Sequence, residues 1–589
     1  MEPFGVEGQP ACKGITIRFI RALTGLLAVA CCLAVISMDE SRAAVATLPQ
    51  LTVDVAMPSA PGLITVCSSG CTYKNHQLQM AIDTAVPGTT IQLKAGEIYQ
   101  SPPDDKGFIL RNKAGSGWIV IRTSTPDVQF APPGERLTVS DAPKLPKLER
   151  TGTYGMTCEP DAHHYRIIGL EFRNPGNAPT GHSSGAFIHC GRFETTVDDQ
   201  PHHIIFDRVY VHGPSGVGQD VRFGVILQGR YQAVIDSWIS DIKHNYSEAN
   251  AIASWGAAGP LRIEDNYIEG SSINILIGGA DPLVPNLTPS DITIVKNTIT
   301  KPLRWKNPEF ALLSVKNLLE LKHAQRVLVE GNTFEGVWPD AQAGFAFMLT
   351  PRQGSGVGAK CGPTGSPGCA PWTIVQDVTI RNNKVKAASN GLAISGRDPG
   401  GIYTYATRSG SRFTIRNNIL EGLGGYPGTG IAFAIGNGPG DVTITHNTVA
   451  KYNAANLDGK GLDLQAGSPS TSARFVFQNN ILLARKYPLF GSIGGCSSAA
   501  LTTYTPGFQW THNAIAGPWP TPAGCTTAIL PGWSAENAFP ASESAIGYEN
   551  YASGIYRLTS ASPFKAAGSD GKDLGVDYVE YVAVHGLWP

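Results

Sequence analysis

The sequence has no excess of charge of one sign. Lys plus Arg total 46 and Asp plus Glu total 47, so there is no global basic field to hold the phosphates of a nucleic acid. Nucleic acid is therefore not an expected partner. After the N-terminal segment, the sequence also lacks any apolar run close to the ~20 residues that a membrane-spanning helix needs. We expect no membrane partner once that segment has been cleaved.

The cysteines lack the paired spacing of a zinc site. Eight of the 11 cysteines follow residue 43: Cys67, Cys71, Cys158, Cys190, Cys361, Cys369, Cys496 and Cys525. An even number in an exported chain indicates disulfides. Pairing of near neighbours would give 67–71, 158–190, 361–369 and 496–525, although sequence alone does not fix this connectivity.

The first 43 residues are typical of a secretory signal. Basic residues up to Arg21 precede an apolar stretch at 22–36, which is short for a bilayer span, and small residues at 41–44 offer a cleavage site. We expect an exported protein, either secreted or located in the periplasm or at the cell surface. A retained membrane anchor is the alternative.

A short apolar strand that ends in a polar turn recurs at intervals of roughly 30 residues. Asn holds the same place in eight of these turns: Asn266, Asn297, Asn332, Asn383, Asn418, Asn447, Asn480 and Asn513. Two short strands and variable loops in each unit are the signature of a parallel β-solenoid. Stacked Asn amides can hydrogen-bond from coil to coil, so we interpret these residues as structural rather than as a binding site.

Other repeat folds explain the pattern less well. A leucine-rich horseshoe would need helices and a Leu pattern that are missing, and propeller blades would need four strands in each unit. We expect a linker and an N-terminal cap with the first strands at 44–160, repeats at 161–515 and a C-terminal cap at 516–589. A short helix is expected near residues 78–82. The protein is expected to be a monomer.

Several phrases carry a resemblance to a known fold. They are AHHYRIIGLEF (162–172), NYIEGSSINILIGGADP (266–282), VKNLLELKHAQRVLVEGNTFE (315–335) and AQAGFAFMLTPR (341–352). They resemble exported bacterial β-helix proteins without an assigned activity, within the pectate-lyase-like superfamily. The resemblance implies an all-β, right-handed parallel β-helix, which we expect to have roughly ten to eleven coils.

Charged residues follow the second strand of successive repeats. Because coils stack about 4.8 Å apart, residues at one coil position form a column. The column expected at these strand ends contains Arg230, Trp255, Asp281, Lys322, Arg352, Arg397 and Asp398. Charges with an aromatic ring near one end suit an extended acidic polysaccharide. Solvated turn residues are the alternative interpretation for any one of them.

Lys322 and Arg352 are expected on adjacent coils, because a Gly-, Pro- and Cys-rich insertion after Arg352 explains the long interval to the next Asn turn. The segment around Lys322 is similar to the alginate lyase and chondroitinase B family. That similarity implies Lys322 as the catalytic base, Arg352 as the acid and Glu320 as a calcium ligand. This chain departs from the family at His323, where a Ser is usual.

The resulting hypothesis is a polysaccharide lyase that cleaves a uronate-containing glycan by β-elimination, with Ca²⁺ as a possible cofactor. Arg230, Trp255, Asp281, Arg397 and Asp398 would bind the substrate. A non-catalytic β-helix that binds glycan is the first alternative. A glycoside hydrolase is the second, and it would need two facing carboxylates about 5–9 Å apart.

Overall fold

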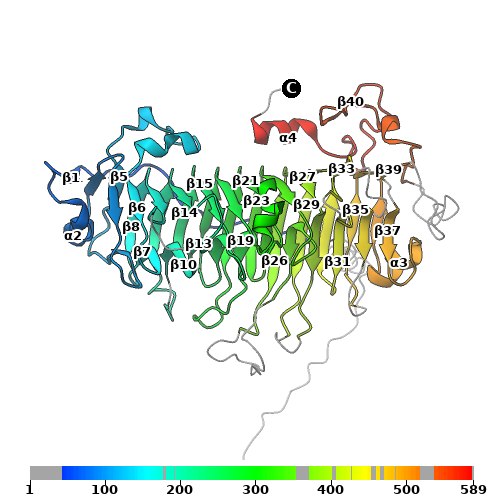
Figure 1. The fold of residues 1–589 in the computed structure, drawn as a ribbon. Helices are drawn as coiled ribbons and strands as arrows, with labels where there is room; N and C mark the ends of the chain where they lie inside the picture. Colours follow the sequence, from blue (N-terminus) through cyan, green and yellow to red (C-terminus); the bar gives the residue numbers. More distant parts are fainter. Residues whose placement is uncertain are drawn as a thin grey trace, which may run out of the picture. The chain divides into compact units, whose positions relative to one another are not determined.

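The computed structural model describes residues 43–586, apart from 177–180, 192, 353–369, 401–405, 426–427, 453–458, 465–469, 484–485 and 518–535. Three long parallel sheets, which we name A, B and C, dominate this region (Figure 1). The chain visits the sheets in turn, and each strand pairs with its counterpart one coil away. The fold is the expected right-handed parallel β-helix.

Sheet A has 14 strands in chain order. They are β1 (Gly62–Val66), β2 (Thr89–Leu93), β5 (Ile119–Thr123), β8 (His163–Ile168), β11 (His202–Asp207), β14 (Arg230–Ile235), β17 (Leu261–Glu264), β20 (Ser290–Val295), β23 (Ala324–Glu330), β26 (Val375–Arg381), β29 (Ser411–Arg416), β32 (Gly440–Thr445), β35 (Val476–Gln478) and β38 (Gln509–Thr511).

Sheet B has 13 strands and sheet C has 12. Sheet B comprises β3 (Ile98–Gln100), β6 (Lys147–Glu149), β9 (Glu171–Arg173), β12 (Tyr210–His212), β15 (Trp238–Ile242), β18 (Tyr267–Gly270), β21 (Thr298–Thr300), β24 (Thr333–Val337), β27 (Lys384–Ala388), β30 (Ile419–Glu421), β33 (Thr448–Ala450), β36 (Ile481–Leu483) and β39 (Ala514–Ala516). Sheet C comprises β4 (Phe108–Leu110), β7 (Tyr154–Cys158), β10 (Gly181–Cys190), β13 (Gln219–Leu227), β16 (Asn250–Ser254), β19 (Ile273–Ile277), β22 (Leu319–Leu321), β25 (Phe345–Leu349), β28 (Asn390–Ser395), β31 (Ile431–Gly436), β34 (Lys460–Leu464) and β37 (Tyr487–Gly491).

The described helices are short. They are α2 (Leu78–Thr84), α3 (Ser498–Tyr504), α4 (Tyr578–His585) and the 3-10 turns η1 (Asn75–Gln77), η2 (Asp127–Gln129), η3 (Val139–Lys144), η4 (Leu303–Lys306), η5 (Pro308–Phe310) and η7 (Glu543–Ile546). The expected helix near residue 80 is confirmed as α2. None of the described helices is long and apolar enough to cross a membrane.

The coils begin earlier than the repeat pattern suggested. Strands between residues 62 and 158 already belong to all three sheets, which is why the sheets exceed the ten to eleven coils expected. The Asn turn is absent from these first coils, so the register that identified the later repeats gave no signal there. Two of the expected disulfides, Cys67–Cys71 and Cys158–Cys190, are present in this part of the chain. The expected pairs 361–369 and 496–525 include residues outside those described.

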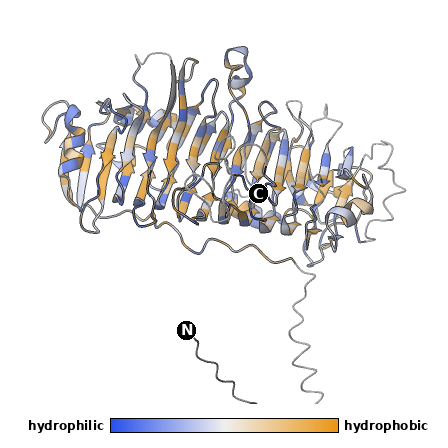
Figure 2. Ribbon diagram, turned by 90° about the horizontal axis from the view of Figure 1, so that it is seen from below, coloured by the Kyte–Doolittle hydropathy of each residue, from blue (hydrophilic) through white to orange (hydrophobic). Residues whose placement is uncertain are grey.

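The core fills the space between the sheets. In β23, Val327 and Val329 are fully buried while Glu330 faces outward. Ile294 and Ile380, on the neighbouring coils, are in register with Val329. Apolar positions therefore repeat from strand to strand, as the orange bands across the sheets show (Figure 2). Each inward side chain packs on its counterparts, so the coils bury a continuous core that no single coil could form.

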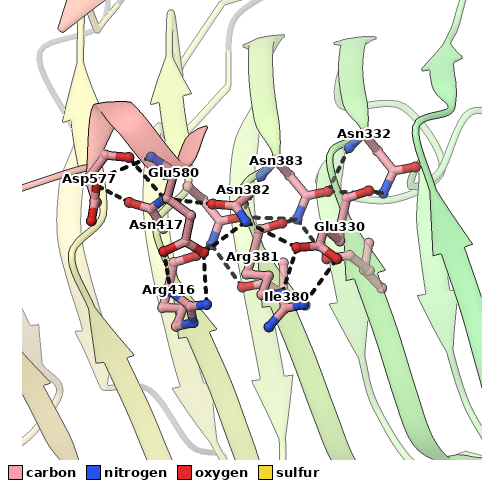
Figure 3. A network of polar contacts seen from close by, with 12 residues as sticks. Glu330, Asn332, Ile380, Arg381, Asn382, Asn383, Arg416, Asn417, Asp577 and Glu580 are labelled. Carbon is pink, nitrogen blue, oxygen red and sulfur yellow. Dashed lines mark hydrogen bonds and ion pairs between the residues drawn. The ribbon is translucent and has the colours of Figure 1, made fainter. Parts of the chain in front are cut away.

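The Asn turns form a ladder of hydrogen bonds between sheets A and B. At each step, the backbone N–H and the side-chain amide of one Asn both donate to the carbonyl oxygen of the next Asn side chain. Asn332 donates in this way to Asn383, with both distances 3.0 Å, as Figure 3 shows. The ladder runs from Asn266 to Asn537, and its members are at least nine-tenths buried. The structural interpretation of the eight Asn residues is confirmed.

A second column of residues runs along the sheet at the positions where the strands of sheet A start. The backbone at these positions is left-handed. In the later coils its residues alternate between Asp and Arg: Asp291, Arg326, Asp377, Arg412, Asp441 and Arg474. Each Arg pairs with the preceding Asp, for example Arg326 with Asp291 at 2.7 Å. The same carboxylates accept backbone N–H groups from residues 44–56, which we call the strap. The strap runs across sheet A, where Arg166 also bonds its Val55 carbonyl at 2.7 Å.

The C-terminal tail first contacts the last coil, where Asn513 donates to Asn537 and Ala514 pairs with Ala538, and then runs back along the solenoid. Helix α4 lies over the Asn turns of the middle coils, not over the end of the solenoid (Figure 1). Glu580 accepts hydrogen bonds from Arg416 and Asn382, and the Asp577 backbone N–H donates to Asn417 (Figure 3). Burial alone would raise the pKa of Glu580, but the hydrogen bonds from Arg416 and Asn382 lower it. The tail is therefore held by polar contacts with several coils.

We expect Asn383→Ala to lower the free energy of unfolding by about 2–3 kcal/mol, because buried donors and acceptors on both neighbouring coils would lose their partner. Equilibrium urea denaturation measures the effect. Asn550→Ala, which removes an exposed Asn from the hairpin of β40 (Tyr548–Asn550) and β41 (Ile555–Leu558), is the control and should change stability by less than about 1 kcal/mol. Equal effects of the two substitutions would contradict the ladder's role.

Candidate functional site

A cleft of about 350 Å³ lies on the outward face of sheet C. Its lining comes from five successive strands and from the loops at their ends: Tyr154, His189, Arg222, Phe223, Ile226, Glu248, Asn250, Trp255, Leu276, Gly278, Gly279 and Ala280. The floor is apolar, because the outward positions of neighbouring strands carry Ile226, Ala253 and Leu276. An apolar floor with a few polar groups above it is the usual composition of a ligand site.

Aromatic side chains line one side of the cleft. The ring of Trp255 lies 6.1 Å from that of Phe223 and 6.2 Å from that of His189, and Tyr154 lies 5.1 Å from His189. These rings come from successive coils, so the sheet spaces them along its length. Trp255, which was predicted to bind substrate from its place at a strand end, does lie in the cleft, after β16.

Basic residues surround one carboxylate in and beside the cleft. Arg222 stacks over the ring of Phe223, with its guanidinium carbon 5.2 Å from the ring centre. Glu248 forms an ion pair with Lys316. Burial would raise the pKa of Glu248, but the hydrogen bond from Lys316 and the charges of Lys316, Lys322 and Arg222 together lower it. Arg222 and Lys322 thus place positive charge next to the Glu248–Lys316 pair, which suits an anionic ligand.

Lys322 stands beside the cleft, directly after β22. Its backbone runs close to Gly278, where the chain is left-handed (φ 89°) and a Cβ would lie 2.4 Å from the His323 nitrogen. Its Nζ lies 2.9 Å from the carboxylate of Glu320, whose side chain is only 1% exposed. The Asn317 amide also donates to Glu320 at 2.7 Å. Glu320 therefore fixes the ammonium group of Lys322 next to the cleft.

Arg352 lies one coil beyond Lys322. Its backbone N–H donates to the Lys322 carbonyl at 3.0 Å, which is the adjacency that the insertion argument predicted. Its guanidinium pairs at 2.7 Å with Asp398, a buried carboxylate from the next coil, and its side chain is 54% exposed. Asp398 therefore positions Arg352, a contact that the sequence pattern did not indicate.

The remaining predicted residues separate into two groups. Asp281 follows the cleft residue Ala280, and Arg397 is an exposed neighbour of Asp398. Arg230 lies elsewhere, at the start of sheet A, where its guanidinium is 3.9 Å from each of the carboxylates of Asp161 and Asp198. The prediction treated Arg230 as the end of a sheet C strand, but Arg230 is the first residue of the next strand, β14 in sheet A.

The residues around Glu320 do not fit the calcium site that the resemblance implied. Ca²⁺ takes six to eight oxygen ligands. Here the carboxylate already accepts from the Asn317 amide and pairs with Lys322. Within the described ranges, no three His, Cys, Asp or Glu ligand atoms gather around Glu320. We therefore derive no step through calcium.

Several cleft residues were not predicted. Tyr154, His189, Phe223 and Glu248 lie on or just before strands of sheet C rather than at the strand ends that were searched. Alternation within each strand was the available signal, because outward positions repeat every second residue. Arg222 lies on β13 close to Asp220, whose carboxylate is 3.7 Å from His244.

No protein-family profile matches this chain, and no curated protein matches it. Among solved structures, the alginate lyase AlyGC is 15% identical, with a TM-score of 0.39 over 88% of this chain and 58% of that one. The polysaccharide lyase Pedsa3628 from Pseudopedobacter saltans is 12% identical, with a TM-score of 0.37 over 82% of this chain and 92% of that one. The Dettilon tailspike protein is 12% identical, with a TM-score of 0.37 over 79% of this chain and 64% of that one.

This chain thus spans about three fifths of the length of the alginate lyase and of the tailspike protein. At these identities the likeness concerns the β-helix alone.

We expect Gly278→Ala to destabilise the protein more than Gly279→Ala. Both residues are left-handed, so each substitution costs about 1 kcal/mol of backbone strain. Only the new Cβ at 278 meets backbone at 2.4 Å, whereas at 279 the nearest atom is the Lys322 Cδ at 3.4 Å. The additional overpacking should cost about 1–3 kcal/mol, measured by urea denaturation. Identical losses would show that the approach of the two coils is not tight.

Proposed function

We propose that this protein is exported and acts on an extended acidic polysaccharide laid across the outward face of sheet C. The observation that carries the proposal is that aromatic rings and Arg222 line the same cleft and that Lys322 lies next to it. Flat rings pack against the apolar faces of sugars, and guanidinium and ammonium groups pair with carboxylates. The described disulfides favour an oxidising compartment, in agreement with export.

The reaction that suits these groups best is β-elimination on a uronate. For this step the Lys322 side chain has to give up its own proton to solvent and leave its ion pair with Glu320. The amine then takes the proton α to the carboxylate, and the electron pair of that C–H bond forms a C=C bond. The C–O bond to the departing sugar breaks, and Arg352 supplies the proton that this oxygen needs. Arg222 can stabilise the charge that develops on the substrate carboxylate. The adjacency of Lys322 and Arg352 supports these two roles.

A second candidate function, glycan binding without cleavage, is favoured by the ion pair between Lys322 and Glu320. An ammonium group held by a carboxylate has no lone pair to accept a proton. In that case Lys322 would contribute only a fixed positive charge at the edge of the cleft, and the protein would bind the polymer at a surface or hold it for another enzyme.

We expect the mature protein to produce unsaturated sugar ends from a polyuronate or a glycosaminoglycan, detected by ultraviolet absorbance. Lys322→Ala should reduce the rate by at least about 100-fold, because it removes the general base. Lys386→Ala, on β27 in sheet B, is the control and should retain full activity. Each polymer is tested with calcium and with chelator, since the calcium requirement is a prediction from the resemblance alone.

We expect Trp255→Ala to weaken binding of the same polymers by about 10-fold or more, because a large aromatic contact surface is lost. Isothermal titration calorimetry with an uncleaved polymer, or with the Lys322→Ala variant, measures the affinity. Tyr487→Ala, on the distant strand β37, is the matched aromatic control. Binding without any product on the whole panel would establish the second candidate. Neither binding nor product would overturn both.

A further inference from the structure

Four histidines gather at the start of sheet A, away from the cleft. They belong to two His-His pairs on adjacent coils, His163–His164 on β8 and His202–His203 on β11. The imidazole of His163 stacks on His202 with ring centres 4.9 Å apart, and His164 stacks on His203 at 4.7 Å. The coil spacing of the β-helix thus holds four imidazoles in a two-by-two array.

The neighbouring coils extend the array and fix its orientation. Tyr231 of β14 stacks on His203 at 4.6 Å, and Trp118 contacts the edge of His164 at 5.2 Å. His164, His203 and Tyr231 are all left-handed, so they occupy the same column that carries the Asp and Arg alternation in later coils. The array is therefore held from both ends.

Within each pair, the Nδ1 atoms point at each other. The Nδ1 atoms of His202 and His203 are 2.7 Å apart, and those of His163 and His164 are 2.8 Å apart. The Nε2 of His202 lies 3.3 Å from the Asp161 carboxylate. A proton on that Nε2 leaves the Nδ1 of His202 with a lone pair directed at His203. A carboxylate that accepts a hydrogen bond from the far nitrogen of a histidine usually orients a metal-binding imidazole.

Burial disfavours a proton on three of these imidazoles. Burial, together with the charges of Arg230 and the other histidines, lowers the pKa of His202 to about 4. Burial and the neighbouring histidines lower the pKa of His203 to about 4 as well, and burial and His163 lower that of His164.

We propose that His164, His202 and His203 form a binding site for a divalent transition-metal ion of the copper, nickel and zinc class. One ligand nitrogen from each of the three lies within 4.8 Å of the others. Imidazole ligands select these ions over calcium and magnesium, which prefer oxygen. The site is independent of the proposed polysaccharide function, since no cleft residue takes part in it.

The close Nδ1 pair indicates how the ion would be held. With metal–nitrogen bonds of about 2.0–2.1 Å, two nitrogens 2.7 Å apart subtend roughly 80° at the metal. That angle is near the right angle between neighbouring ligands of a square-planar or octahedral ion and well below the tetrahedral value, which favours Cu²⁺ or Ni²⁺. The ion would replace the proton that the two nitrogens share.

Arg230 is a nearby cation that opposes metal binding, because its charge acts on His202 and His203. It is in turn 3.9 Å from the carboxylates of Asp161 and Asp198. These two carboxylates offset its charge, so the surroundings of the three ligands are not strongly positive. Arg230, which was predicted to bind polysaccharide, is better placed to orient Asp161 behind His202.

The test is Cu²⁺ binding to the full chain carrying no polyhistidine tag. We expect one equivalent to bind with a Kd in the micromolar range or below, and the electron paramagnetic resonance spectrum to show splitting by imidazole nitrogens. His203→Ala should weaken binding by at least 10-fold, and Asp161→Asn should weaken it by about 10-fold while keeping all three ligands. His76→Ala, which removes an exposed imidazole, should change nothing.

Circular dichroism and the metal-free Tm of each variant verify that it is folded. If His203→Ala fails to fold, His164→Gln serves in its place. Unchanged stoichiometry and affinity in a folded His203→Ala or His164→Gln variant would overturn the proposal, and so would the absence of a nitrogen-coordinated Cu²⁺ signal from the unmodified chain.

Discussion

The buried amide ladder is the constraint on which the coils from Asn266 onward depend. Each Asn from Asn266 to Asn513 donates two hydrogen bonds to the side chain of the next Asn. Its side-chain amide also donates to a backbone carbonyl of the preceding coil. These groups are buried, so a slip of one residue would leave several of them without partners at considerable cost. From Asn266 onward the ladder therefore fixes the register of successive coils, and with it the outer columns of side chains in that part of the β-helix.

Columns on the outer faces give this scaffold its chemistry. One column at the start of sheet A changes along its length, from stacked aromatic rings at His164, His203 and Tyr231 to alternating Asp and Arg. On sheet C, the outward positions carry apolar and aromatic residues beside basic ones. The same spacing of about 4.8 Å thus serves imidazole stacking, ion pairing and the cleft, depending only on which side chain stands at the position.

Much of the fold was accessible from sequence, because the Asn residues mark turns in register. The sequence also predicted that Lys322 and Arg352 are adjacent, once the segment after Arg352 was recognised as an insertion in a loop between strands. The earliest coils could not be predicted in this way, since they lack the Asn turn. The Asp and Arg alternation was visible in phrases such as QDVTI, SRFTI and GDVTI, but it stands at the other end of the strands whose turns were compared.

The sequence pattern does not predict which side chains contact each other. Spacing places Arg352 and Asp398 one coil apart, but it does not say that the guanidinium turns to that carboxylate. Similarly, Glu320 looked like a metal ligand until its contacts with Asn317 and Lys322 were known. The cleft itself arises from side chains of five strands. Its members are far apart in sequence, and only the stacking of coils brings them together.

The outward face of sheet C is the proposed binding surface for the polysaccharide. Hydrogen exchange of the Lys322→Ala variant, followed by mass spectrometry with and without a polyuronate, tests this most directly. The account predicts slower exchange in peptides covering 222–226, 248–256 and 276–280, with 204–208 in sheet A unchanged. Protection confined to sheet A or sheet B, with none in the sheet C peptides, would contradict it.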